Sequence, residues 1–225
     1  MGSNTTLKAA DGHSFDAYVA QPPEGKRYGG IVVVQEIFGV NSHIRNIADG
    51  YAAQGYVAIA PALYDRVQPK YESGYEQAEI QAGMAIRAKV PNDGALADIK
   101  AAMDYLAARD LPIGIVGYCW GGNLVWQSAC KLDGLSAAVS YYGGGVQDMG
   151  DLKPKCPTML HFGEKDHAIP IDKVKAFMGK QPGLPVHIYD ANHGFNCDHR
   201  GSYDAPSAKL ALERTLAFFG ENLGK

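Results

Sequence analysis

The sequence lacks the features that mark nucleic-acid binding, secretion or membrane insertion. Its 225 residues carry 21 Lys and Arg against 24 Asp and Glu, which gives a net charge of −3. A face that binds phosphates needs clustered Lys and Arg, and no such run occurs, so nucleic acid is excluded as the main partner. No apolar run approaches the roughly 20 residues of a membrane span. The first residues also lack the charged-then-apolar pattern of a signal peptide.

Cysteine is scarce as well. The four cysteines show no paired spacing such as CxxC, and a chain of this length without a secretion signal favours free thiols in a reducing cytoplasm. We therefore expect a cytoplasmic protein with one domain over 1–225, as a monomer or a weak homo-oligomer. These cysteines are Cys119, Cys130, Cys156 and Cys197.

Short apolar runs alternate with segments of helical period, a pattern typical of an α/β fold with a mostly parallel, doubly wound sheet flanked by helices. Residues 15–20 alternate more, and predict an antiparallel edge strand or hairpin arm. Within 65–92, a polar helix over 71–89 could form a small cap or lid. The core strands are expected at 31–34, 56–60, 113–116, 135–140, 158–162 and 186–189, and the other helices at 43–54, 93–108, 123–131 and 207–222.

The strongest chemical motif is Gly117-Tyr118-Cys119-Trp120-Gly121-Gly122, between a predicted strand and a predicted helix. This G-x-C-x-G pattern is a nucleophile elbow with Cys in place of Ser. The chain turns so sharply there that side chains two positions before and after Cys119 would collide, which explains the glycines. The helix N-terminus also favours a thiolate. The alternative is a Gly-rich turn around a buried structural cysteine.

An acid and a base should follow the nucleophile in chain order. Asp166 comes just after the predicted strand at 158–162, and His193 just after the one at 186–189, where a parallel sheet presents functional groups. We predict that His193 is the base and that Asp166 fixes its tautomer. A zinc site of His193, Cys197 and His199 lacks a fourth ligand, so no metal is expected. The competing histidines are His161 and His187 within strands, His167 beside the predicted acid, and His199.

The chain resembles the dienelactone hydrolases (carboxymethylenebutenolidases) through nearly its whole length. The residues that carry the resemblance are Gln35-Glu36-Ile37-Phe38-Gly39, Ala60-Pro61-Ala62-Leu63-Tyr64, the elbow at 117–122, Tyr141-Tyr142-Gly143, Gly163-Glu164-Lys165-Asp166 and His193-Gly194-Phe195. The resemblance implies an α/β-hydrolase fold with small or no cap and a triad of Cys119, Asp166 and His193. It also implies an oxyanion hole made by the backbone N–H groups of Ile37 and Trp120, in agreement with the general rule for this fold.

Glu36 directly follows a predicted buried strand, where a carboxylate is unfavourable unless it is paired or protonated. It could simply point into water at the strand end. By the resemblance, the matching glutamate contacts the cysteine and helps to switch it between thiol and thiolate. Glu36 would then accept the proton of Cys119 when substrate arrives.

The resemblance is weaker for substrate recognition. Family members bind a substrate carboxylate with two arginines, but one position aligns with Cys197 and the other falls near 76–79, where no Arg occurs. Arg87 is the arginine nearest to 76–79, and Arg200 or Lys70 could bind the substrate carboxylate in place of the two family arginines. An apolar pocket for a small ring or acyl group could be lined by Phe38, Tyr64, Tyr141 and Trp120, although core packing explains each of them equally well.

These features together predict a hydrolase of small esters or lactones that works through a thioester acyl-enzyme and requires no cofactor. Within the same class, the substrate could be an ester other than dienelactone, and a peptidase is disfavoured. From other classes, two alternatives stay open. One is a non-catalytic protein that binds a small lactone, and the other is a redox enzyme in which Cys197 resolves Cys119.

Overall fold

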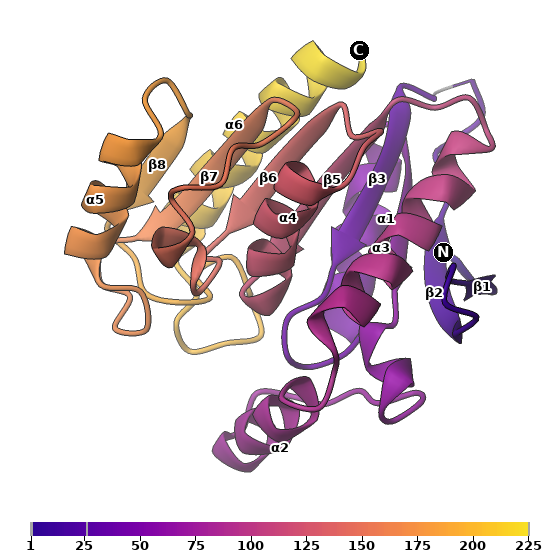
Figure 1. Ribbon diagram of the computed structural model, residues 1–225, viewed down its shortest axis with the longest axis horizontal. Helices are drawn as coiled ribbons and strands as arrows, with labels where there is room; N and C mark the ends of the chain where they lie inside the picture. The colour runs from indigo at the N-terminus through magenta and orange to yellow at the C-terminus, as the bar shows by residue number, and fades with distance from the viewer. Residues whose placement is uncertain (1, 26, 225) are drawn as a thin grey trace.

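A single sheet of eight strands runs through the computed structural model (Figure 1), which describes residues 2–25 and 27–224. The ends of the predicted domain, at 1 and 225, lie outside the described residues. The strand order is β1-β2-β4-β3-β5-β6-β7-β8, and the strands from β4 to β8 all pair in parallel. The expected α/β sheet is therefore confirmed. The strands are β1 Ser3–Lys8, β2 Ser14–Ala20, β3 Gly29–Val34, β4 Tyr56–Pro61, β5 Ile113–Tyr118, β6 Ala137–Tyr141, β7 Thr158–Gly163 and β8 Val186–Tyr189.

The central strands consist almost wholly of small and β-branched residues because helices cover both of their faces. Every residue of β3, β4 and β5 is buried, as expected for parallel strands between two helical layers. Figure 1 shows α3 and α4 in front of the sheet and α1 and α6 behind it. The helices are α1 Ser42–Ala53, α2 Gln77–Arg87, α3 Asn92–Ala107, α4 Trp120–Lys131, α5 Ile171–Lys180 and α6 Ala205–Leu223, with short 3-10 turns at Leu63–Arg66 and Val146–Asp148.

The edge of the sheet differs from the prediction. Residues 15–20 do form an antiparallel strand, β2, but β1 pairs with its outer side and takes the edge position. The sequence analysis missed β1 because five of its six residues are polar and four of these are exposed. Only the neighbouring strand supplies the hydrogen bonds that stabilise such a segment.

The first turns of α3 and α1 are capped differently. The N-cap of α3 is Pro91, and the Asn92 side chain exchanges hydrogen bonds with Gln127 of α4. The N-cap of α1 is Asn41, whose side chain accepts a hydrogen bond from the N–H of Ile44.

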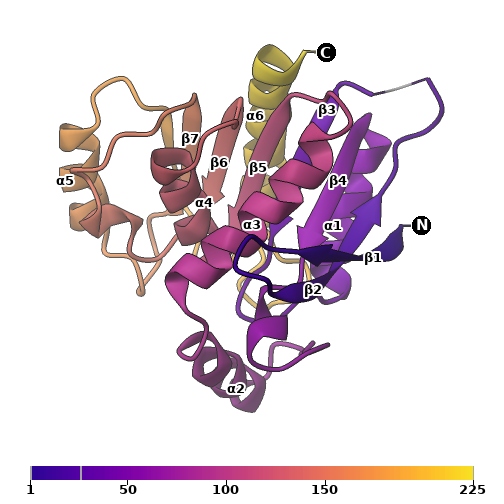
Figure 2. The same cartoon turned by 45° about the vertical axis from the view of Figure 1, so that its right-hand side comes forward.

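The predicted helix over 71–89 is shorter than expected. It begins only at Gln77, after a capping box in which Glu76 and Glu79 each accept a hydrogen bond from the other's backbone N–H. Figures 1 and 2 both show this helix, α2, apart from the helices that cover the sheet and beyond the C-terminal ends of the strands. Its Gly83 packs so closely on the carbonyl of Ile37 that an added Cβ would lie 2.2 Å from that oxygen. The segment therefore covers the region directly after β3.

Among the described residues, no helix combines the length and the apolar character that crossing a membrane requires.

Candidate active site

The elbow after β5 has the backbone geometry that its glycines predict. Cys119 adopts φ 55° and ψ −116°, an unfavourable conformation for a residue with a Cβ. A Cβ on Gly117 would lie 2.4 Å from the carbonyl oxygen of Gly121, and one on Gly121 would lie 2.4 Å from that of Val34. Both glycines are therefore required sterically. The turn presents the partly exposed Cys119 at the first turn of α4.

Two loops from distant parts of the chain bring His193 and Asp166 together. The Asp166 carboxylate accepts a hydrogen bond from Nδ1 of His193 at 2.7 Å through Oδ2, and one from the N–H of Ala168 at 2.8 Å through Oδ1. Asp166 is buried, and these two donors hold its carboxylate in place. This arrangement assigns the proton of the neutral imidazole to Nδ1 and leaves Nε2 for another partner.

The elbow thiol lies close enough to His193 to affect its protonation. Burial lowers the pKa of His193, but the negative charge of Cys119 and the hydrogen bonds to Asp166 and Cys119 outweigh burial and raise the pKa to about 10. The ring edge of Tyr142 also packs on His193 at a centroid distance of 5.2 Å. Asp166 and His193 thus form a hydrogen-bonded pair, and Cys119 lies close enough to His193 to raise its pKa.

The two residues expected to form an oxyanion hole lie beside the elbow. Trp120 is the first residue of α4, where backbone N–H groups have no acceptor within the helix. Ile37 follows the end of β3, and that end packs tightly against Gly121 of the elbow. The backbone after β3 and the start of α4 therefore approach each other within van der Waals contact near the thiol.

Glu36 does not point into water. It is 1% exposed, and its Oε1 accepts a hydrogen bond from Arg200 at 3.3 Å. Its Oε2 is buried without a hydrogen-bond partner among the described residues. The alternative of a solvated strand-end glutamate is therefore wrong, and in this structure the partner of Glu36 is Arg200.

Three of the four residues predicted to bind substrate lie around this site. Tyr64 stacks on Trp120 at 5.4 Å between ring centroids and donates its hydroxyl to the carbonyl of Gly83. The guanidinium of Arg200 lies 5.7 Å from the ring centroid of Phe38 and close enough to Cys119 for their charges to interact. Tyr64 and Phe38 are each 1% exposed, so both form the floor of the site more than its open wall.

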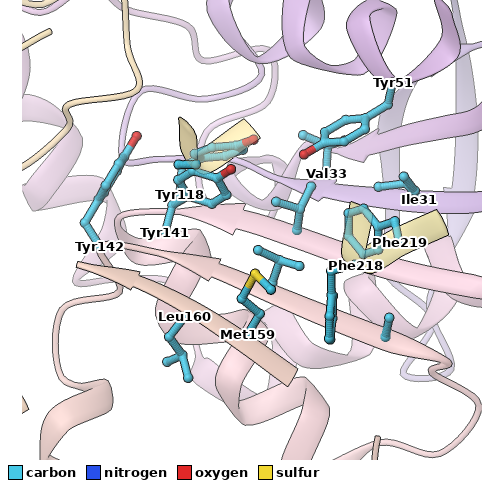
Figure 3. Packing of buried hydrophobic residues seen from close by; sticks show 14 of the residues in the cluster. Ile31, Val33, Tyr51, Tyr118, Tyr141, Tyr142, Met159, Leu160, Phe218 and Phe219 are labelled. Carbon is cyan, nitrogen blue, oxygen red and sulfur yellow. The ribbon is translucent and has the colours of Figure 1, made fainter. Parts of the chain in front are cut away.

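Tyr141 is a correction to the sequence analysis. Its side chain is fully buried, and its hydroxyl pairs with Thr215 of α6 at 2.6 Å. Figure 3 shows it beside Tyr118 within the packed cluster between the sheet and α6. Only the backbone of Tyr141 reaches the site, because its carbonyl accepts the N–H of Cys119 at 3.0 Å. The residue lies directly after a buried strand pattern, which does not reveal the side to which its ring turns.

The histidines that compete with His193 have other surroundings. His161 is buried and hydrogen-bonded to Tyr189 and Thr215, while His167 and His199 are exposed. The sequence analysis missed His43, a buried residue of α1 whose Nδ1 lies 3.3 Å from Asp198. The sequence analysis placed His43 only at the start of the predicted helix at 43–54. The signal that could have revealed it is its place on the inward face, where a histidine needs a partner.

Two grooves of the described surface lie near the elbow. One of about 530 Å³ passes Gln35, Tyr64, Lys70 and Tyr71, and so borders the site on the side of Tyr64. Another of about 540 Å³ lies between α1 and α6. All four cysteines are free, and the buried Cys197 shares a hydrogen bond with Tyr75.

A mostly parallel sheet with a nucleophile elbow after its central strand β5, followed by an acid and a histidine after two later strands, defines an α/β-hydrolase. Residues 15–223 match the profile of the Dienelactone hydrolase family. The chain belongs to this family and is a hydrolase of the dienelactone hydrolase type.

Relatives cover almost the whole chain. A carboxymethylenebutenolidase from Pseudomonas putida is 34% identical over 95% of this chain and 94% of its own length. A Synechocystis protein provisionally assigned the same activity is 35% identical over 92% of this chain and 91% of its own. Among solved structures, a provisionally assigned dienelactone hydrolase from Klebsiella pneumoniae superposes with a TM-score of 0.83 at 30% identity, covering 97% of this chain and 99% of the other.

Proposed function

We propose that the protein hydrolyses small esters or lactones with Cys119 as nucleophile, His193 as acid and base, and Asp166 as the group that orients His193. The single observation that supports this most is the hydrogen bond of His193 to the Asp166 carboxylate beside the thiol at the strained elbow, which raises the pKa of His193. A thiol placed for packing alone would not need a histidine and a buried aspartate beside it.

The reaction follows from these positions. The thiolate of Cys119 attacks the carbonyl carbon, and the backbone N–H groups of Trp120 and Ile37 bind the oxyanion. The imidazolium of His193 gives its proton to the leaving alkoxide as the C–O bond breaks, which leaves a thioester. The neutral imidazole then takes a proton from water, the resulting hydroxide attacks the thioester, and the acid and thiolate are released. In a lactone, the leaving alcohol stays attached to the acyl group.

Thiolates suit activated esters such as enol lactones, whose leaving groups are stabilised, better than amides. The aromatic floor formed by Phe38 and Tyr64 fits a small ring or short acyl group. For a substrate carboxylate, Arg200 lies close enough to the thiol for their charges to interact, but its guanidinium already pairs with Glu36. We therefore propose small uncharged esters and lactones as preferred substrates, ahead of dienelactone.

The test is a panel of p-nitrophenyl acetate, simple lactones and carboxylate-bearing enol lactones, assayed with wild type, Cys119→Ala and Cys130→Ser. We expect turnover of uncharged substrates that iodoacetamide abolishes, a loss of at least about 100-fold in Cys119→Ala, and no loss in Cys130→Ser. Activity confined to carboxylate-bearing lactones would overturn the substrate preference. Unchanged turnover in Cys119→Ala would overturn the mechanism, and saturable lactone binding without turnover would identify a binding protein.

A further inference from the structure

Three side chains with metal-binding atoms meet in a buried position beside the active site. Glu36 follows β3, His43 lies in the first turn of α1, and Cys197 lies on the loop that carries His193. One ligand atom from each of the three lies within 4.8 Å of the other two. The exposed fractions are 1%, 4% and 0%, so water does not solvate these groups freely.

Two of these side chains have a polar atom without a partner. Oε2 of Glu36 and Nε2 of His43 are both buried and accept or donate no hydrogen bond among the described residues. A buried polar atom without a partner is unfavourable by about 1–3 kcal/mol, so two of them in one cluster of neighbouring side chains need a reason. A bound cation would satisfy both atoms at once.

The remaining atoms of these groups have partners of the kind that metal ligands use. Nδ1 of His43 lies 3.3 Å from Asp198, and Oε1 of Glu36 accepts a hydrogen bond from Arg200 at 3.3 Å. The thiol of Cys197 shares a hydrogen bond with Tyr75. In metal sites, a ligating histidine typically donates its second N–H to a carboxylate, and a ligating carboxylate accepts hydrogen bonds through its second oxygen. The described contacts reproduce both arrangements.

We propose that Glu36, His43 and Cys197 form a binding site for a divalent cation of the zinc class. The donor set of one carboxylate oxygen, one imidazole nitrogen and one sulfur suits a borderline-soft ion and does not suit Mg²⁺ or Ca²⁺, which prefer all-oxygen sites. Three protein ligands leave a fourth tetrahedral position open for water or another ligand.

Charge and proton balance are compatible with this site. His43 would coordinate through a neutral imidazole nitrogen, and Cys197 would coordinate as the thiolate after losing the proton of its thiol. Binding therefore exchanges the thiol proton for a metal–sulfur bond and releases one proton to solvent. One carboxylate and one thiolate then neutralise the dication.

The test uses Co²⁺ as a spectroscopic probe in full-length Cys119→Ala protein, which removes the catalytic thiol as a competing ligand. We expect one Co²⁺ per chain, with visible bands of a tetrahedral ion and a near-ultraviolet thiolate-to-metal band, and displacement by Zn²⁺. A second substitution, Cys197→Ser, should abolish the thiolate band, and Asp198→Asn should weaken binding by about 10- to 100-fold. Retention of the full thiolate band in Cys197→Ser would overturn the proposal.

Two matched controls separate this site from its neighbours. Cys156→Ser changes another half-buried thiol and should leave the spectrum unchanged. His199→Gln alters an exposed cluster in which His43 and Asp198 also take part, and it should leave the thiolate band in place. Because Cys197→Ser could disturb the loop, X-ray absorption of the zinc-loaded Cys119→Ala protein gives a second measurement. We expect one sulfur at about 2.3 Å with nitrogen and oxygen ligands, and a shell of nitrogen and oxygen alone would refute the site.

This inference does not depend on the proposed function, since binding is measured in a protein without Cys119. A failure of the ester assay leaves the cobalt spectrum as expected, and a failure of cobalt binding leaves the assay as expected.

Discussion

The pair of Glu36 and Arg200 offers a test of the buried electrostatics beside the thiol. In Arg200→Met, the methionine keeps most of the volume of the arginine side chain but removes its charge. Glu36 is 1% exposed, and Arg200 is its one hydrogen-bond donor among the described residues. The substitution therefore leaves a carboxylate buried without a counter-charge, a change that is strongly destabilising, by about 3–5 kcal/mol when both partners are fully buried.

The exposure of Arg200 lowers the expected loss of stability, and the free energy of protonating a glutamate sets a ceiling on that loss. Arg200 is 17% exposed, so water can partly replace it and the loss should be nearer about 2–3 kcal/mol. A glutamate can also escape by protonation. An ordinary glutamate carboxyl, with a pKa of about 4.3, can be protonated at pH 7 for about 3.7 kcal/mol, which is the ceiling. The ceiling falls by about 1.4 kcal/mol per pH unit, so the effect of Arg200→Met should shrink from pH 7 toward pH 5.

The measurement is the free energy of unfolding from urea titrations of wild type and Arg200→Met at pH 7 and pH 5. The double variant Glu36→Gln/Arg200→Met removes both charges and should recover most of the stability lost in Arg200→Met. A loss below about 0.5 kcal/mol at pH 7, or a loss that stays constant down to pH 5, would refute the view that Arg200 stabilises a buried charge.

Three further predictions concern the elbow and its surroundings. Glu36→Gln should lower kcat for p-nitrophenyl acetate by about 100-fold with an unchanged circular dichroism spectrum, and an unchanged rate would exclude a role in proton transfer. Gly121→Ala should destabilise the protein by about 1–3 kcal/mol, because its Cβ would lie 2.4 Å from the backbone of β3. As a control, Gly144→Ala should change the stability little, because nothing lies within 4 Å of the added Cβ. Equal melting temperatures of the two variants would contradict the steric requirement at Gly121. The raised pKa of His193 contributes stability that is complete below an ordinary histidine pKa near 6.5 and is lost as the pH rises through about 10. The free energy of unfolding should therefore fall between pH 7 and 10, and it should fall less steeply in Cys119→Ser. Parallel pH profiles of the two proteins would show that the thiol does not raise this pKa.

The parallel core of the fold could be predicted because burial on both faces forces apolar runs such as those of β3 and β5. Elements that depend on tertiary contacts were missed. β1 is stabilised by pairing with β2, and its polar sequence carries no such information. The amphipathic α5 was also overlooked, although Val174 and Phe177 lie at helical spacing after Pro170.

In the site, the chain order of Cys119, Asp166 and His193 predicted three groups that lie close together, with a hydrogen bond between Asp166 and His193. The elbow glycines carry this information because their steric requirement is local. The orientation of single side chains was not predictable in the same way. Tyr141 turns into the core, and the contact of Glu36 with Arg200 joins residues 164 positions apart. Such a contact is decided by the packing of loops, which leaves no periodic pattern in the sequence.

A cation bound by Glu36 would distinguish two routes for the proton of Cys119. If Glu36 accepts that proton, saturating Zn²⁺ occupies the oxygen it needs and should lower turnover of the wild-type enzyme. If His193 alone accepts it, the bound cation should leave turnover unchanged, because the hydrogen bonds of His193 go to Asp166 and Cys119. Zinc could also inhibit by binding the catalytic thiol directly, and Cys197→Ser separates the cases. Inhibition through Glu36 should be lost in that variant, whereas direct inhibition should persist. Zinc inhibition of equal strength in wild type and Cys197→Ser would therefore refute the route through Glu36.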